Sequence, residues 1–134
     1  MKVLIDTSVW SRALRSQDGQ AERQEIKRLI NDFRVAMIGP IRQEALSGMR
    51  HEAQFEKARK KLRSFEDIPL STEVHELAAS YFNLCRAKGI QGSHIDFLIC
   101  AVAATHQLEI YTLDEDFNLY ADHLPIQLYT PADL

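Results

Sequence analysis

The chain has 134 residues, a length typical of one domain and sufficient to bury a hydrophobic core. Hydrophobic residues make up 46% of the chain and charged residues 26%, which excludes an intrinsically disordered protein. The net charge of −3 argues against a protein that binds nucleic acid through overall positive charge alone.

The cysteines and the apolar segments indicate where the protein is found. Cys85 and Cys100 lie in apolar stretches without metal-type spacing, which is typical of buried thiols in a reduced protein. The N-terminus lacks the long apolar core and the cleavage site of a signal peptide. The longest apolar run, residues 97–104, is too short to span a membrane. We therefore expect a cytoplasmic protein without membrane association.

Short apolar runs and helical periodicities alternate along the chain. Strands are predicted at residues 2–5, 35–38, 110–112 and 126–129. Helices are predicted at residues 21–33, from Pro40, at 52–65, at 71–88, from Ser93, and at 114–120. The helix from Ser93 contains residues 97–104, which are apolar all round as in a helix buried on every side. This alternation predicts a single α/β domain over residues 1–134, with a central, mostly parallel sheet and helices on both faces.

Four acidic residues lie at junctions between the predicted elements: Asp6, Glu44, Asp96 and Asp114. In a parallel sheet, the carboxyl ends of the strands and the starts of the following helices share one rim, where ligands bind. Taken singly, each acid has a structural explanation. Asp6 and Asp114 fit helix N-caps, Asp96 completes a capping box with Ser93, and Glu44 fits a solvated helix surface. The expected convergence of all four acids on one rim favours a shared role instead.

Carboxylates packed closely together suppress one another's ionisation unless a cation is present. A cluster of carboxylate oxygens suits Mg²⁺ or Mn²⁺, which leaves water in place for chemistry on a phosphoryl group. The hydroxyls of Ser8 and Thr112 are suited to orient a ligating acid or a bound water. Local hydrogen bonding to the backbone is the alternative role for both hydroxyls.

These motifs, in this order, resemble the PIN domain family, and more narrowly the VapC-type toxins of prokaryotic toxin–antitoxin pairs. The resemblance extends over essentially the whole chain. It depends on four features: the strand ending in Asp6-Thr7-Ser8, Glu44 in a helix after a short strand, Ser93-x-x-Asp96 before an apolar helix, and the segment Ile110-Tyr111-Thr112-Leu113-Asp114-Glu115-Asp116-Phe117.

The resemblance implies an endoribonuclease that depends on Mg²⁺ or Mn²⁺. Asp6 and Asp96 would be the principal metal ligands, and Glu44 and Asp114 would complete the acidic pocket directly or through water. A metal-activated water would hydrolyse the RNA phosphodiester, leaving a 5′-phosphate and a 3′-hydroxyl. The implied substrate is transfer RNA or another structured RNA. The implied partners are a cognate antitoxin, whose C-terminal tail lies over the active site, and a second copy of the chain in a homodimer.

Several alternatives remain open from the sequence. Asp116 competes with Asp114 for the fourth acidic position, and Asp114 fits better because it lies two residues after Thr112.

The same fold and acidic pocket occur in structure-specific DNA nucleases. A phosphohydrolase with Asp6 as nucleophile usually needs a second Asp two residues later, where this chain has Ser8. A non-enzymatic metal-binding regulatory module of the phospho-receiver kind needs a late Lys, and none follows Lys88.

The charge is unevenly distributed along the chain. Residues 50–63 contain two acidic residues and six basic ones, a net charge of +4, whereas residues 89–134 contain seven acidic residues and no Lys or Arg. Such a basic segment is either a contact for the RNA backbone or a solvated helix face. The candidate RNA contacts are Arg50, Lys57, Arg59, Lys60, Lys61 and Arg63.

Overall fold

Four short parallel strands form the centre of the computed structural model, which describes residues 1–132. They are β1 (Val3–Ile5), β2 (Val35–Ala36), β3 (Glu109–Tyr111) and β4 (Gln127–Leu128), arranged in the order β2-β1-β3-β4. All three pairings are parallel, so the carboxyl ends of the strands lie at the same edge of the sheet. The predicted α/β class with a parallel sheet is therefore confirmed.

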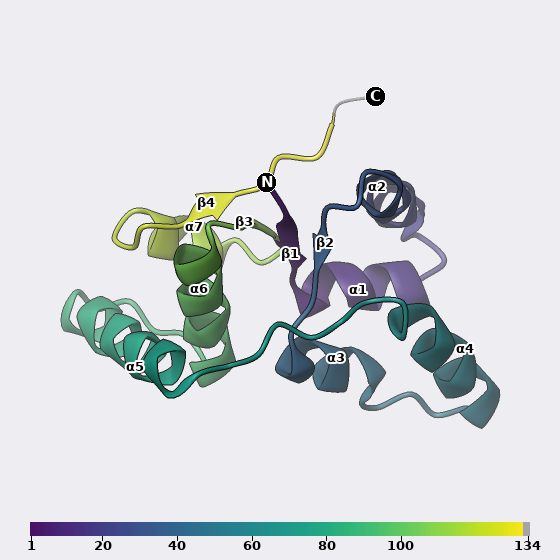
Figure 1. Ribbon diagram of the computed structural model, residues 1–134, viewed down its shortest axis with the longest axis horizontal. Helices are drawn as coiled ribbons and strands as arrows, with labels where there is room; N and C mark the ends of the chain where they lie inside the picture. The colour runs from purple at the N-terminus through teal and green to yellow at the C-terminus, as the bar shows by residue number, and fades with distance from the viewer. Residues whose placement is uncertain (133–134) are drawn as a thin grey trace.

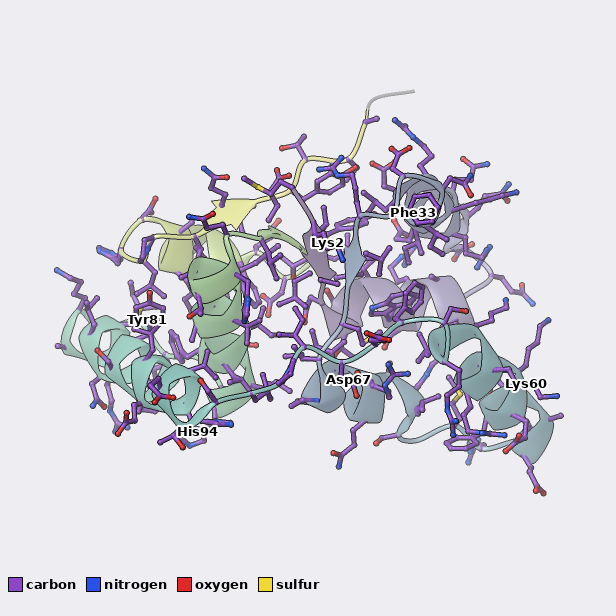
Figure 2. All side chains as sticks on the ribbon, viewed as in Figure 1. Lys2, Phe33, Lys60, Asp67, Tyr81 and His94 are labelled. Atoms are coloured by element: carbon purple, nitrogen blue, oxygen red, sulfur yellow. The ribbon has the colours of Figure 1, made fainter. Side chains whose placement is uncertain are left out.

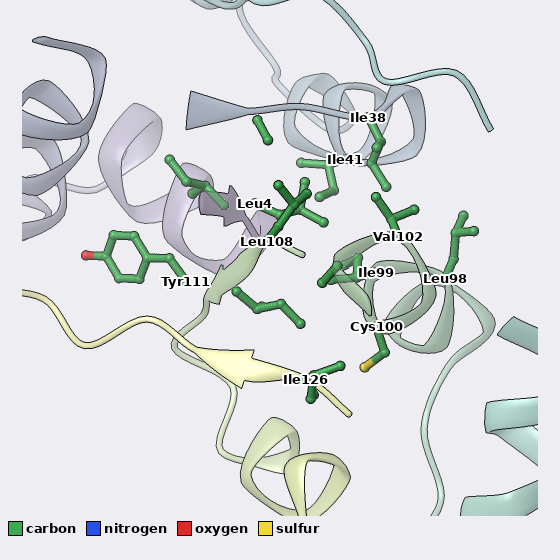
Figure 3. Close-up of a cluster of buried hydrophobic side chains, with 14 of the residues drawn as sticks. Leu4, Ile38, Ile41, Leu98, Ile99, Cys100, Val102, Leu108, Tyr111 and Ile126 are labelled. Carbon is green, nitrogen blue, oxygen red and sulfur yellow. The ribbon is translucent and has the colours of Figure 1, made fainter. Parts of the chain in front are cut away.

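Seven helices surround the sheet within residues 1–132 (Figure 1). They are α1 (Thr7–Arg15), α2 (Gln20–Asn31), α3 (Gly39–Leu46), α4 (Glu52–Leu62), α5 (Thr72–Ala87), α6 (His94–His106) and α7 (Asp116–Ala121). Helix α6 lies on one side of the strands, and α1 and α2 lie on the other (Figure 3). Helices α4 and α5 lie at opposite ends of the molecule, and the chain between them crosses beneath the sheet in the view of Figure 1.

The hydrophobic core lies between the sheet and α6 (Figure 3). All residues of the run Phe97–Ala103 are buried, as its apolar composition predicts. From the strands, Leu4 and its register partner Ile110 are fully buried. Helix α6 precedes β3, so its first turn lies at the edge of the sheet where the strands end.

The structure differs from the sequence prediction at four helices. The sequence prediction gives no range for α1, although it offers Asp6 as a helix N-cap, the position that Asp6 takes in the structure. The helix predicted over residues 21–33 ends at Asn31, and Phe33 lies beyond it with a φ of 55° and a side chain that is 87% exposed. The helix expected from residue 114 begins at Asp116, and α4 ends at Leu62 rather than at residue 65.

Within residues 1–132, the helices are all too short or too polar to span a lipid bilayer. The expected single domain of residues 1–134 includes Asp133 and Leu134, which lie outside the described residues.

Candidate active site

Asp6 follows β1 directly, and both oxygens of its carboxylate accept hydrogen bonds. The residue is 8% exposed. Its Oδ1 accepts a hydrogen bond from the backbone N–H of Thr7 at 2.8 Å, and the residue is the N-cap of α1. Its Oδ2 accepts hydrogen bonds from the hydroxyls of Ser8 and Thr112, each at 2.8 Å. The carboxylate therefore caps a helix and is also fixed in orientation, so its capping role does not exclude a second one.

Ser8 and Thr112 join the ends of two neighbouring strands. The parallel register pairs Ile5 of β1 with Tyr111 of β3, which places Thr112 beside Asp6. The Ser8 hydroxyl accepts a hydrogen bond from the N–H of Leu113, and the Thr112 hydroxyl accepts one from the N–H of Asp114, both at 3.0 Å. Each hydroxyl thus donates to Asp6 and accepts from the segment after β3. This network fixes the position of the backbone at Asp114 relative to Asp6.

Asp96 lies in the first turn of α6 and forms a capping box with Ser93. The N–H of Asp96 donates to the Ser93 hydroxyl at 3.1 Å, and the N–H of Ser93 donates to Oδ2 of Asp96 at 3.4 Å. The same Oδ2 accepts a hydrogen bond from the Tyr120 hydroxyl at 3.0 Å. Burial raises the pKa of Asp96, and the charge of Asp114 acts in the same direction, whereas the hydrogen bonds from Tyr120 and Ser93 lower it.

Asp114 is half-buried in the turn between β3 and α7. Its Oδ1 accepts a hydrogen bond from the N–H of Asp116, the first residue of α7, at 2.9 Å. The N-cap residue of this helix is Glu115. Asp116 is exposed at the start of α7. Of the two candidates for the fourth acid, Asp114 is the one joined to Thr112.

Three of the four acids share one electrostatic environment at the rim of the sheet. The charge of Asp114 raises the pKa of Asp96, and burial followed by the charges of Asp96 and Asp6 raises the pKa of the buried Cys100 thiol. The three acids do not form a complete metal-binding site, however. No group of three or more Asp, Glu, His or Cys side chains within residues 1–132 is placed so that it could hold a metal ion.

Glu44 stands apart from the other three acids. It lies on α3, which follows β2 and therefore begins at the same edge of the sheet. Its side chain is exposed and forms no hydrogen bond or ion pair within the part of the chain that the structure describes. The structure thus places Glu44 on the expected helix without bringing its carboxylate into contact with the hydrogen-bonded acids.

Comparison with known proteins identifies the family. The model of the PIN domain family matches residues 3–122. The chain belongs to the PIN domain family. PIN domains are generally nucleases that use divalent metal ions. The comparison with curated proteins gave no match.

Solved structures with the same fold as this PIN domain include three complexes. A chain of FitAcB from Neisseria gonorrhoeae is 21% identical with a TM-score of 0.75, and the match covers 98% of this chain and 99% of that one. A chain of VapBC2 from Rickettsia felis, bound to a DNA fragment from its promoter, is 16% identical with a TM-score of 0.78 and coverages of 99% and 100%. A chain of a toxin–antitoxin complex from Klebsiella pneumoniae is 20% identical with a TM-score of 0.69 and coverages of 99% and 100%. The resemblance to the PIN domain family is confirmed by the family match, and at these identities the likeness to the solved structures shows the fold.

The basic segment of the PIN domain lies on and around α4, at one end of the molecule (Figure 2). Arg59 is engaged in an ion pair with Glu56 at 2.6 Å, and this hydrogen bond lowers the pKa of Glu56. The other candidate RNA contacts are exposed: Arg50, Lys57, Lys60, Lys61 and Arg63. The structure therefore leaves five of the six side chains facing solvent.

The donor atoms at the rim of the PIN domain fit a hard divalent cation. They are carboxylate and hydroxyl oxygens, the ligands that Mg²⁺ and Mn²⁺ prefer. Mg²⁺ takes one or two carboxylates and keeps several waters, so it does not require a complete protein cage. Two carboxylates of this kind are present. Asp6 is oriented by two hydroxyls, and Asp96 lies in the first turn of a buried helix.

Tyr120 was not predicted as a residue of this site. It lies 24 positions after Asp96, on a short helix whose apolar pattern indicates only burial. No local motif joins the two residues, because their contact depends on how α7 packs against the start of α6. The only signal in the sequence was a polar hydroxyl on an otherwise buried helix face, since a buried Tyr hydroxyl usually has a hydrogen-bond partner.

Proposed function

We propose that this PIN domain is the toxin of a toxin–antitoxin pair and that it cleaves RNA as an Mg²⁺- or Mn²⁺-dependent endoribonuclease. The observation that carries the proposal is the carboxylate of Asp6, fixed by Ser8 and Thr112 at the rim where Asp96 and Asp114 also lie. A helix cap needs only the hydrogen bond from Thr7. The two additional hydroxyl donors to Oδ2 support a role of Asp6 as a metal ligand, because such donors fix the orientation of a ligating carboxylate.

Each acidic residue at the rim would have a separate role in binding the cation. Asp6 and Asp96 would hold the cation, Asp114 would add negative charge beside Asp96, and the exposed Glu44 would complete the set through water. When bound, the ion would stabilise charge on the scissile phosphate and lower the pKa of the attacking water. Ser8 and Thr112 would keep Asp6 in one orientation, so that little reorganisation is needed during the reaction.

RNA is the substrate in this proposal, with transfer RNA or another structured RNA as the first choice. The exposed basic side chains around α4 supply the sequence-independent part of nucleic-acid affinity. The same acidic rim would also serve a DNA nuclease, so the substrate has to be decided by experiment. A role in RNA cleavage would place the protein in the cytoplasm.

An apolar groove beside α1 and α2 supports a protein partner. The groove has a volume of about 390 Å³, and its lining includes the apolar side chains Trp10, Ile26, Ile30 and Phe65. Arg23, Lys27 and Lys61 also line it. An amphipathic helix with acidic flanks fits such a groove, and a cognate antitoxin is the partner we propose. A homodimer is part of the same proposal, and the mass of the purified protein in solution tests it.

The decisive experiment incubates the purified chain, free of any partner, with mixed cellular RNA that includes transfer RNA. The reactions contain Mg²⁺, Mn²⁺ or EDTA, and a parallel series replaces RNA with single-stranded and branched DNA. Asp96→Asn removes a proposed ligand, and Asp122→Asn is the matched control because Asp122 is exposed at the end of α7. Glu44→Gln tests the role of the exposed Glu44 separately.

We expect discrete RNA fragments with 5′-phosphate ends that need both the metal and Asp96 and that persist in Asp122→Asn. The loss in Asp96→Asn should exceed about 100-fold, since even residues that only orient a metal ligand contribute about 10- to 100-fold. Cleavage confined to DNA would replace the substrate in the proposal. No cleavage of either nucleic acid by folded protein would reject the enzyme and favour a binding module.

A further inference from the structure

Tyr120 is the largest of the fully buried side chains, and its hydroxyl lies against the Asp96 carboxylate. The residue is 0% exposed on α7, and its hydroxyl donates to Oδ2 of Asp96 at 3.0 Å. The backbone oxygen of Gln91 lies farther from the same hydroxyl, at 3.4 Å. The shorter contact identifies Asp96 as the principal acceptor.

The Tyr120 ring is held in place by neighbouring aromatic side chains. Its centroid lies 4.9 Å from that of Phe97 and 5.1 Å from that of Phe117. Both neighbours are buried, and Phe97 directly follows Asp96 in α6. Because the ring cannot shift without disturbing this cluster, the direction of its hydroxyl towards Asp96 is fixed by packing.

Gly92 leaves the space that the Tyr120 hydroxyl occupies. A Cβ atom at position 92 would lie 2.3 Å from the Tyr120 hydroxyl and 2.9 Å from Cε2 of Phe97. Real Cβ atoms do not approach this closely, so any side chain here would force the tyrosine or the loop to move. The loop before α6 is therefore shaped to admit this hydroxyl beside Asp96.

The Asp96 carboxylate accepts all of its hydrogen bonds within residues 1–132 through one oxygen. Oδ2 accepts from the Tyr120 hydroxyl and from the N–H of Ser93, whereas Oδ1 accepts no hydrogen bond within residues 1–132. The carboxylate is thus fixed through one oxygen, and the other is left without a protein donor. For Asp6 the corresponding orientation comes from Ser8 and Thr112, on different elements.

We propose that Tyr120 is a positioning residue that orients the Asp96 carboxylate for binding a divalent cation, with Gly92 providing the space for its hydroxyl. The inference rests on the proposed function, because it assigns Asp96 as a ligand. Tyr120 acts through Asp96 and does not touch the RNA or the ion. The competing explanation is structural, since a buried Tyr hydroxyl requires a partner whatever the function of that partner.

The test measures Mn²⁺ binding to the full chain by calorimetry or by the electron paramagnetic resonance of free Mn²⁺, without any RNA. Tyr120→Phe removes the hydroxyl and keeps the ring. The matched control is Tyr129→Phe, which removes a hydroxyl that donates to Glu25 at 2.7 Å. We expect the Kd for Mn²⁺ to rise by about 10- to 100-fold in Tyr120→Phe and to stay unchanged in Tyr129→Phe. Thermal unfolding in EDTA shows whether both variants are folded.

A second variant, Gly92→Ala, keeps the tyrosine and displaces its hydroxyl. It should weaken Mn²⁺ binding in the same direction, and combining it with Tyr120→Phe should add little, because both changes break the same contact. A purely structural role would lower the unfolding temperature of these variants while leaving the Kd for Mn²⁺ unchanged, and that result overturns the inference.

Asp96→Asn separates failure of the inference from failure of the proposed function. If the wild-type chain binds Mn²⁺ and Asp96→Asn does not, unchanged binding in Tyr120→Phe rejects only the role of Tyr120. If the folded wild-type chain binds no Mn²⁺, or binds it equally well with Asp96→Asn, the metal-dependent function is rejected together with the inference.

Discussion

The Thr112 hydroxyl, at the end of β3, donates a 2.8 Å hydrogen bond to Oδ2 of Asp6, at the end of β1. The two residues are 106 positions apart in the sequence, and the parallel pairing of β1 with β3 makes them neighbours. The same hydroxyl accepts from the N–H of Asp114 at 3.0 Å. A single side chain thus ties together two of the proposed site acids.

Replacing Thr112 by Val tests this link with little change of shape. The variant removes the donor to Asp6 and the acceptor for the N–H of Asp114. We expect Mn²⁺ affinity and RNA cleavage to fall by about 10-fold or more. The unfolding free energy should fall by about 1–3 kcal/mol, because a part-buried N–H loses its acceptor. Calorimetry, a cleavage assay and urea unfolding measure the three quantities.

Thr112→Ser is the matched control, since it keeps the hydroxyl and loses only the methyl group. It should retain most of the metal affinity and the cleavage rate. Equal losses in the Ser and Val variants would show that the hydroxyl does not orient Asp6.

The stability of the metal-free protein should depend on pH through Asp96. Burial raises the pKa of this carboxyl above its ordinary value of 3.8, so the folded protein keeps a proton that the unfolded chain has lost. The stability contributed by the neutral carboxyl is complete below pH 3.8 and is lost as the pH rises through the raised pKa. At neutral pH the ionised carboxylate therefore destabilises the fold.

Asp96→Asn removes this destabilisation. In EDTA, the variant should melt at a higher temperature than the wild type at pH 7, and the difference should disappear towards pH 3.8. Thermal unfolding across this range measures the effect, with Asp122→Asn as a control at an exposed position. A wild type that gains stability relative to Asp96→Asn as the pH rises would contradict the sign of the shift.

The sequence predicted the sheet and most helices because these depend on local patterns. The apolar strand before Asp6 and the all-apolar run in α6 are short-range signals of burial, and the structure confirms both. The missed helix α1 shows the limit of such signals. Its apolar stripe is short, with Val9 and Trp10 buried and Ala13 and Leu14 packed against the core, and it lies among polar and charged residues.

Contacts between side chains on distant elements could not be predicted in the same way. The alternation of elements placed Asp6, Asp96 and Asp114 at one rim, but not the hydroxyl of Tyr120 beside Asp96. That contact is decided by the packing of Phe97 and Phe117 around the tyrosine ring. Phe33 is a further case, because the helix predicted to reach residue 33 ends at Asn31 and the left-handed backbone at Phe33 leaves its side chain exposed.

Charge reversal on α4 tests its role in binding RNA. Lys60→Glu with Lys61→Glu should weaken RNA binding and lower the slope of log affinity against log salt by roughly 1.4–1.8, at about 0.7–0.9 per lost phosphate contact. Salt titrations of binding to RNA, in a variant that does not cleave, give this slope. The control reverses Lys2 and Lys88, which are also exposed and carry the same total charge. The same slope in the wild type and the α4 variant would show that these lysines do not contact RNA and belong to a solvated helix face.

Glu25 should stabilise the C-terminal segment independently of the active site. This α2 residue is 5% exposed, and its Oε2 accepts hydrogen bonds from the Tyr129 hydroxyl at 2.7 Å and from the N–H of Ala132 at 2.9 Å. Glu25→Ala leaves both donors without this acceptor and should lower the unfolding free energy by about 2 kcal/mol. Gln24→Ala, at the exposed neighbouring position, should change it by less than about 0.5 kcal/mol. Urea unfolding measures the loss, and hydrogen exchange should show a faster-exchanging Ala132 amide in Glu25→Ala. RNA cleavage should remain at the wild-type rate below the unfolding temperature, and a slower rate would show that this segment also supports the rim acids.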